Sequence, residues 1–153
     1  MASESALSES QEDYLEAIYH IVKKKHAARA KDISRRLGVN NSSVTGALRA
    51  LSQKGLVNYE PYDLITLTSE GDEIAGRVVK RHEFLLDFLV RVLGIPADEA
   101  EVSACHLEHS LTDIVFERLI QFVDTVTDKN GDSVVWKEPA GFTRADRRTG
   151  EGR

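Results

Sequence analysis

Two short helix-forming segments separated by a glycine restrict the fold of this chain more than any other feature. Apolar residues at helical spacing predict a helix over 30–37, which Gly38 ends. After a tight connection, Ser42 begins a second helix that Gly55 ends. Two short helices joined through a glycine-containing turn are typical of a helix-turn-helix, in which the second helix enters the major groove of DNA.

The segments on either side extend this motif into a domain. A serine cap and apolar residues at helical spacing predict a helix that ends at the lysine run 23–25. Downstream, two apolar and β-branched runs, 56–60 and 64–67, flank a proline turn and predict a β-hairpin. A hairpin directly after the second helix is a wing, so we expect a winged helix-turn-helix DNA-binding domain over 8–68.

The rest of the chain is also expected to be helical, which makes the fold mainly α. A long helix, apolar over much of its circumference, stops near Gly94, and two more helices are predicted over 97–109 and 111–126. Such a helix needs partners on several sides, so we interpret 69–126 as a helical dimerisation domain, to which the metal-binding residues described below are also assigned. A monomeric helical subdomain is the alternative. Residues 127–153 are expected to form a partly disordered tail, within which Val134, Val135 and Trp136 are candidates for docking on the body of the protein. The inward residues expected on the last helix are Ile114, Val115, Leu119, Ile120 and Val123.

Charge is distributed unevenly along the chain, although the formal net charge is −5. Between His20 and Glu60, nine lysines and arginines face two acids, so this segment is +7 and the remainder must be −12. A basic module attached to an acidic one is typical of a protein that binds a polyanion such as DNA. A solvated, lysine-rich helix end would give a similar local charge and is the alternative.

Composition also indicates in which cellular compartment the chain is expected to function. No run of about 18 apolar residues occurs, so no membrane span is predicted. The first ten residues are polar and acidic, unlike a secretory signal. The single cysteine, Cys105, suits a reducing compartment, and we expect a cytoplasmic location.

A thiol, carboxylates and an imidazole recur on one side of the helix expected over 97–109. Each residue of a helix advances by about 100°. Glu101, Cys105, Glu108 and His109 therefore project within about a quarter turn of one another. Sulfur, carboxylate and imidazole together can hold a first-row divalent ion. The alternative is an exposed polar face beside a small buried cysteine.

Three further residues of metal-ligand type lie on other predicted helices. Asp13 and Glu16 are spaced i, i+3, so they share a face of the first helix, and His82 lies midway along the long helix. Taken alone, the acidic pair is typical of an ordinary amphipathic helix, and His82 of a surface or hydrogen-bonded histidine.

Six blocks of sequence lie between Gln11 and Val123: 12–19 (EDYLEAIY), 41–45 (NSSVT), 54–57 (KGLV), 67–71 (LTSEG), 81–83 (RHE) and 104–111 (ACHLEHSL). In their order and spacing they resemble the DtxR/MntR family of metal-dependent transcriptional repressors. The resemblance implies a repressor that binds DNA as a homodimer under control of a metal ion. The chain resembles the short members that lack an SH3-like third domain.

The resemblance also implies a ligand set, and here the chain is a hybrid. The ligands of the manganese-sensing branch resemble Asp13, Glu16, His82, Glu108 and His109, with another carboxylate where Cys105 stands. In the iron-sensing branch a cysteine occupies that position, a methionine replaces the aspartate, and an acid stands where this chain has Leu86. The cofactor implied is Fe²⁺ or Mn²⁺, and the sulfur favours Fe²⁺ slightly.

The predicted recognition helix carries side chains suited to phosphates and base edges. Asn40 and Ser42 are equally well explained as helix caps. The lysines 23–25 and Arg35 or Arg36 are expected to contact phosphate. The residues predicted to bind DNA are Arg35, Asn40, Asn41, Ser42, Ser43, Thr45 and Arg49.

These observations predict a metal-dependent repressor of metal-homeostasis genes that binds double-stranded DNA at a palindromic operator as a homodimer. The first alternative is a metal-independent winged-helix regulator. The second, a small metalloenzyme, rests on carboxylates and histidines that also suit di-iron chemistry. No nucleophile–base arrangement or phosphate loop was identified, so we expect no catalytic residue.

Overall fold

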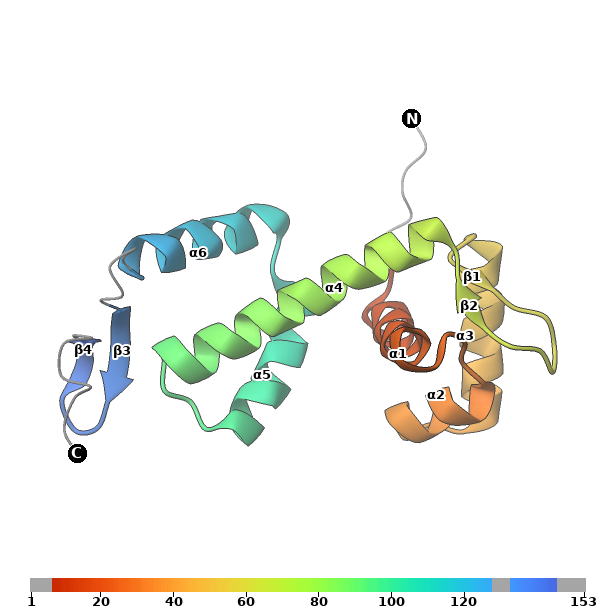
Figure 1. The fold of residues 1–153 in the computed structure, drawn as a ribbon, viewed down its shortest axis with the longest axis horizontal. Helices are drawn as coiled ribbons and strands as arrows, with labels where there is room; N and C mark the ends of the chain where they lie inside the picture. The colour runs from red at the N-terminus through yellow and green to blue at the C-terminus, as the bar shows by residue number, and fades with distance from the viewer. Residues whose placement is uncertain (1–6, 128–132, 146–153) are drawn as a thin grey trace. The chain divides into compact units, whose positions relative to one another are not determined.

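The computed structural model describes residues 7–127 and 133–145, which divide into two compact units with the border between Lys80 and Arg81. One helix, α4 (Ser69–Asp87), crosses this border. The first unit contains α1 (Glu9–Lys25), α2 (Ala30–Leu37), α3 (Asn41–Gln53), β1 (Val57–Asn58) and β2 (Thr66–Leu67) (Figure 1). The second contains the π-helical turn η1 (Phe88–Val92), α5 (Ala97–Ser110), α6 (Asp113–Val126), β3 (Ser133–Lys137) and β4 (Gly141–Ala145).

Local side-chain and backbone chemistry defines the ends of the first three helices. Ser8 and Gln11 form a capping box at the start of α1. Gly38 ends α2 in the left-handed conformation, with φ of 66°. Helix α3 begins one residue before Ser42, and Asn40 is its cap, which is the alternative left open for that residue. The Asn40 Oδ1 accepts a hydrogen bond from the Ser43 amide at 2.8 Å.

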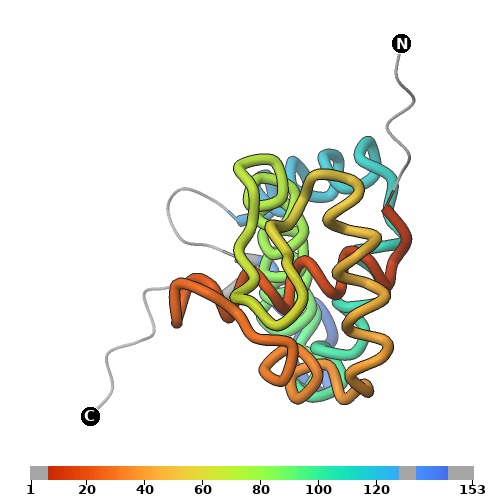
Figure 2. Tube along the Cα trace, turned by 90° about the vertical axis from the view of Figure 1, so that its right-hand side faces the viewer, coloured from red at the N-terminus to blue at the C-terminus, as the bar shows by residue number. Residues whose placement is uncertain are grey.

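The core of the first unit is made by one face of each helix and by the wing. The two strands of the wing pair antiparallel, with Val57 opposite Leu67. Figure 2 shows the chain passing from α3, in orange, into this hairpin, in yellow. Ala28 and Ile65 exchange two backbone hydrogen bonds, which attach the segment before α2 to the hairpin. The larger side chains with no exposed surface are Leu15, Ile18, Ile33, Val44, Leu48, Leu51 and Ile65.

The N-terminus of α4 packs closely against the chain that leaves α3. Thr68 caps the helix by accepting a hydrogen bond from the Gly71 amide, and its hydroxyl donates to the Gly55 carbonyl. A Cβ atom at Gly71 would lie 1.9 Å from the Leu56 carbonyl oxygen. Only glycine permits this approach, so α4 is fixed against the start of the wing.

The second unit packs α5 and α6 against the second half of α4 and η1. The expected long helix is not α-helical throughout: beyond Asp87 the backbone widens to a π-helical turn, in which the Leu93 amide donates to the Phe88 carbonyl. Phe84 and Phe116 meet edge to face, with ring centres 5.3 Å apart. The buried residues of this core are Leu85, Leu89, Ala100 and Ala104.

One expectation for α6 is wrong. Ile114 and Val115, expected to face inward, are 56% and 48% exposed, and Phe122 on the same side of the helix is 56% exposed. Of the five residues expected inward, only Val123 is buried, while Leu119 and Ile120 are half-buried. An amphipathic pattern predicts that a face will be covered, but here no part of the described chain covers it.

The segment expected to be a partly disordered tail contains a β-hairpin. β3 and β4 pair antiparallel, and Trp136 opposes Phe142 with an edge-to-face ring contact. Trp136 also lies over Gly94. The Cβ atom of Trp136 is 3.1 Å from the position that a Cβ atom would occupy if Gly94 had one. The contact with Gly94 agrees with the expected docking of Trp136, whereas the hairpin itself was not expected. Cross-strand aromatic pairing stabilises it despite the polar composition of the segment. The final residues, 146–153, lie outside the described part.

The fold class is confirmed as mainly α, with an N-terminal winged helix-turn-helix followed by a helical unit. Among the described residues, no helix is both long enough and apolar enough to span a bilayer.

Candidate metal centre and nucleic-acid interface

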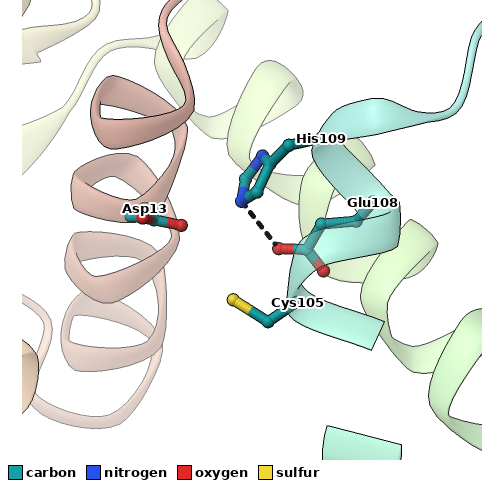
Figure 3. A group of neighbouring side chains, drawn as sticks. All are labelled: Asp13, Cys105, Glu108 and His109. Carbon is teal, nitrogen blue, oxygen red and sulfur yellow. Dashed lines mark ion pairs between the residues drawn. The ribbon is translucent and has the colours of Figure 1, made fainter. Parts of the chain in front are cut away.

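Three side chains with metal-ligating atoms converge on one face of α5. Cys105, Glu108 and His109 are spaced i, i+3 and i+4, which places them on neighbouring turns of one helix face. A ligand atom from each lies within 4.8 Å of the others, and Figure 3 shows their side chains extending from the same side of the helix. His106, between them in sequence, is exposed. The helical spacing therefore predicted which α5 residues share this face.

The carboxylate of Glu108 is the centre of this group. The residue is 3% exposed, and each of its oxygens faces an imidazole nitrogen. Oε2 lies 2.6 Å from Nδ1 of His82 on α4, and Oε1 lies 3.3 Å from Nε2 of His109. A carboxylate this deeply buried requires positive charge or protons close by. Two histidines, a thiol and a buried carboxylate satisfy the donor chemistry of a first-row divalent ion.

Glu101, also predicted as a ligand, lies one helical turn before Cys105. Its Oε1 is 3.0 Å from Nε2 of His82, the ring nitrogen that faces away from Glu108. Its side chain is 59% exposed, whereas that of Glu108 is buried. Glu101 and Glu108 therefore contact different nitrogens of the same histidine, His82.

Asp13 and Glu16 lie in the first unit, on α1. Both are half-buried, and they share a side of the helix, as their i, i+3 spacing predicts. Nε2 of His20 lies 3.5 Å from Oε1 of Glu16, one turn further along. Within the first unit, α1 therefore presents a stripe of two carboxylates and an imidazole.

Arg81, the neighbour of His82 in sequence, was not singled out by sequence reasoning. Its guanidinium donates to the Leu111 carbonyl, at the end of α5, and to the Asp113 carboxylate at the start of α6. It also lies over the Phe116 ring, 4.9 Å from the ring centre. Arg81 thereby ties α4 to the connection between α5 and α6. Only the block around 81–83 signalled its importance.

A second candidate site is an open groove of about 1040 Å³ in the first unit, between the helix-turn-helix and the wing. It is lined by α2, α3 and the hairpin, and four of its side chains are cationic. The single acid in the lining is Asp63. These cations, Arg29, Lys31, Arg35 and Arg49, form a positive surface suited to phosphates.

Four of the seven predicted DNA-binding residues line this groove: Arg35, Asn41, Thr45 and Arg49. Asn41, Ser42 and Ser43 are exposed in the first turn of α3, and Arg49 is exposed further along it. Asn40 is also exposed and caps the helix. Thr45 donates its hydroxyl hydrogen to the Asn41 carbonyl at 3.0 Å.

Sequence reasoning missed three residues of this surface as individual sites. Arg29 and Lys31 were counted only in the total charge of the basic segment. Tyr62 is fully exposed in the wing turn, with φ of 68°. A proline turn predicts where a wing bends but not which side chain extends from it.

Ion pairs engage two of the lysines expected to contact phosphate. Lys23 lies 2.9 Å from Asp72, and the hydrogen bond between them raises the pKa of Lys23. Lys25 lies 2.9 Å from Asp32, and this hydrogen bond lowers the pKa of Asp32 below its ordinary value. The pairs tie α1 to other elements of the first unit, so these lysines would contribute less to phosphate binding than isolated cations.

Comparison with known proteins assigns the two halves of the chain. Residues 6–64 match the model "Iron dependent repressor, N-terminal DNA binding domain", and residues 68–133 match "Iron dependent repressor, metal binding and dimerisation domain". The uncharacterized HTH-type transcriptional regulator MJ0568 of Methanocaldococcus jannaschii is 40% identical over 124 residues, which are 80% of this chain and 99% of that relative. The chain belongs to the DtxR/MntR family of metal-dependent transcriptional repressors.

Other DtxR/MntR relatives agree in sequence and fold. MntR of Bacillus subtilis is 39% identical over 103 residues, which cover 67% of this chain and 72% of the relative. The crystal structure of T. acidophilum IdeR has a TM-score of 0.65 at 31% identity and covers 76% of this chain and 54% of that one. A manganese-dependent repressor in complex with manganese has a TM-score of 0.67 at 29% identity, covering 87% and 61%. This chain spans less than two thirds of the length of either solved structure.

Membership of the DtxR/MntR family excludes the metalloenzyme alternative, because the matched families and relatives are transcriptional repressors. It also supports a divalent transition metal as cofactor, since both iron- and manganese-dependent proteins occur among the matches.

Proposed function

We propose that this chain is a metal-activated repressor that senses Fe²⁺ or Mn²⁺ and controls genes of metal homeostasis. The observation that carries the proposal is the buried Glu108 carboxylate, whose two oxygens face His82 and His109 beside the Cys105 thiol. A divalent cation supplies the positive charge that these donors require.

We propose further that Asp13 and Glu16 act with this group as ligands. Their support is the family resemblance and the carboxylate stripe on α1, which is chemically suited to Fe²⁺ or Mn²⁺. Carboxylates that share an ion would repel one another until a cation neutralises them. Neutralising them would lower the free energy of the arrangement in which the first unit binds DNA.

For DNA binding, the basic groove and the first turn of α3 are the proposed contact surface. Arg35 and Arg49 would neutralise phosphates, and Asn41, Ser42 and Ser43 would reach phosphates or base edges. A homodimer presents two recognition helices, and a palindromic operator with half-sites about 34 Å apart matches that symmetry.

The sharpest test compares Glu108→Gln with wild-type protein, because glutamine keeps the size of the side chain and removes its charge. Operator binding is measured anaerobically with Mn²⁺, Fe²⁺, Co²⁺ or Zn²⁺ and with a chelator. We expect metal to tighten wild-type binding and to have little effect on Glu108→Gln. Glu117→Gln, at an exposed position on α6, is the matched control and should behave like wild type.

If a chelator leaves the operator affinity of the wild-type protein unchanged, the result would contradict the proposal and favour a metal-independent winged-helix regulator. Calorimetry separates these outcomes in a second way, since a metal-independent regulator would take up neither Mn²⁺ nor Fe²⁺ stoichiometrically.

A further inference from the structure

We infer that Glu101 does not bind the metal ion but is a positioning residue, which orients His82 by accepting a hydrogen bond from its outer nitrogen. This inference rests on the proposed metal-binding function. It changes the role of Glu101 from the ligand that sequence spacing predicts to a hydrogen-bond acceptor one step removed from the ion.

The geometry of the His82 ring carries the argument. The two nitrogens of an imidazole point in different directions, so one ion can bind only one of them. Nδ1 lies 2.6 Å from Oε2 of Glu108, the carboxylate that groups with the Cys105 thiol and the His109 ring. Nε2 lies 3.0 Å from Glu101, on the other side of the ring. Nδ1 is therefore the nitrogen that faces the cluster of donors.

Exposure separates the roles of the two glutamates. The Glu101 side chain is mostly in contact with solvent, whereas those of His82 and Glu108 are largely buried. A solvated carboxylate is well suited to accept a hydrogen bond from an imidazole N–H. To bind the same ion as Nδ1, Glu101 would have to reach around the ring from its Nε2 side.

The chemical consequence concerns where the ring proton resides. A neutral imidazole that binds a cation through Nδ1 must carry its proton on Nε2. Glu101 accepts that proton in a hydrogen bond, so it favours this tautomer and holds the ring plane toward the cluster. Carboxylates that orient ligating histidines in this way commonly contribute about 10- to 100-fold to metal affinity.

Glutamine distinguishes positioning from ligation, because its amide oxygen accepts the same hydrogen bond but is a poor substitute for a carboxylate ligand. Calorimetry of the full chain with Mn²⁺ should show a loss of about 10-fold or more for Glu101→Ala. For Glu101→Gln, affinity should stay within about threefold of wild type. Glu99→Gln, exposed on the same helix, is the matched control and should leave the affinity unchanged.

A spectroscopic readout tests the tautomer directly. In Zn²⁺-loaded protein, ¹⁵N NMR of His82 should show a metal-bound Nδ1 and a protonated Nε2 in wild type and Glu101→Gln. The Nε2 proton should exchange faster in Glu101→Ala. Unfolding of the metal-free variants checks that their folds are equally stable.

Two results overturn the inference while leaving the proposed function intact. If Glu101→Gln loses as much affinity as Glu101→Ala, Glu101 is a ligand. If neither variant changes affinity, its contact with His82 has no role in metal binding. Failure of the wild-type chain to bind any of these metals would instead refute the proposed function itself.

Discussion

Cys105 is the residue at which this chain departs from the manganese-type ligand pattern that it otherwise resembles. Its thiol lies on the same face of α5 as Glu108 and His109. Thiolate favours Fe²⁺, Co²⁺ and Zn²⁺ over Mn²⁺, whereas a carboxylate at this position would favour Mn²⁺. The identity of one side chain is thus expected to bias the choice of metal.

Replacing Cys105 with Glu should therefore move the preference toward Mn²⁺. We expect the ratio of Mn²⁺ to Co²⁺ affinity to rise by about tenfold, equivalent to about 1.4 kcal/mol. Competition titrations measure that ratio, and the thiolate-to-cobalt absorption band should disappear in the variant. Cys105→Ser is the control for loss of sulfur without gain of charge. An unchanged ratio would mean that the sulfur does not contact the ion.

For individual residues, sequence reasoning was most successful where the residues belong to a single helix. The spacing of Cys105, Glu108 and His109 predicted their common face. The link from His82 to Glu108, and the second link to Glu101, join different helices. Helical spacing cannot supply distances between elements. For the same reason, the contacts that Arg81 makes with α5 and α6 from α4 could not be predicted, although the sequence block 81–83 includes this residue.

At the scale of helices and strands, the residues at which an element begins or ends were predictable where the sequence supplies a helix cap or a glycine in the left-handed conformation. α2 spans the expected residues because Gly38 adopts a left-handed conformation. The exposed face of α6 and the hairpin β3–β4 were not predictable in this way. The first depends on what covers a helix. The second depends on Trp136 contacting Gly94, which is remote in sequence.

Asn40 offers a test of an element end that also faces the proposed DNA surface. Asn40→Ala removes the cap of α3 and should lower the free energy of unfolding by about 1 kcal/mol. Asn40→Asp should preserve the cap and the stability. Its negative charge should nevertheless weaken operator binding several-fold. Denaturant unfolding and DNA titration measure the two effects. Equal stability of the alanine variant and wild type would mean that the cap contributes little.

Gly71 tests the packing of α4 against the wing. Gly71→Ala places a Cβ where the Leu56 carbonyl lies, so the helix or the strand must move. We expect a loss of about 2 kcal/mol or more in the free energy of unfolding. Gly46→Ala, on α3 with open space around its Cβ position, should instead increase stability by about 0.5–1 kcal/mol. Similar effects of the two substitutions would contradict the close approach.

At the scale of the whole molecule, we expect a second copy to pack on the exposed apolar face of α6, which lies within the region matched to a dimerisation domain. Phe122→Glu places a charge on this face and should shift the chain toward monomer, raising the dimer dissociation constant by about 10-fold or more. Sedimentation measures the shift. Glu117→Gln serves again as the exposed control. Unchanged association would place the dimer contact elsewhere.

The proposed function finally requires that metal and operator influence each other equally. If metal raises operator affinity by a factor of about 5 to 150, saturating operator must raise metal affinity by the same factor, because the free-energy coupling is shared. Metal titrations with operator, with scrambled DNA and without DNA measure this. Scrambled DNA binds mainly through phosphates and should have a smaller effect that falls steeply with salt. If saturating operator leaves metal affinity unchanged, the ion and the DNA act independently, and metal occupancy cannot regulate repression.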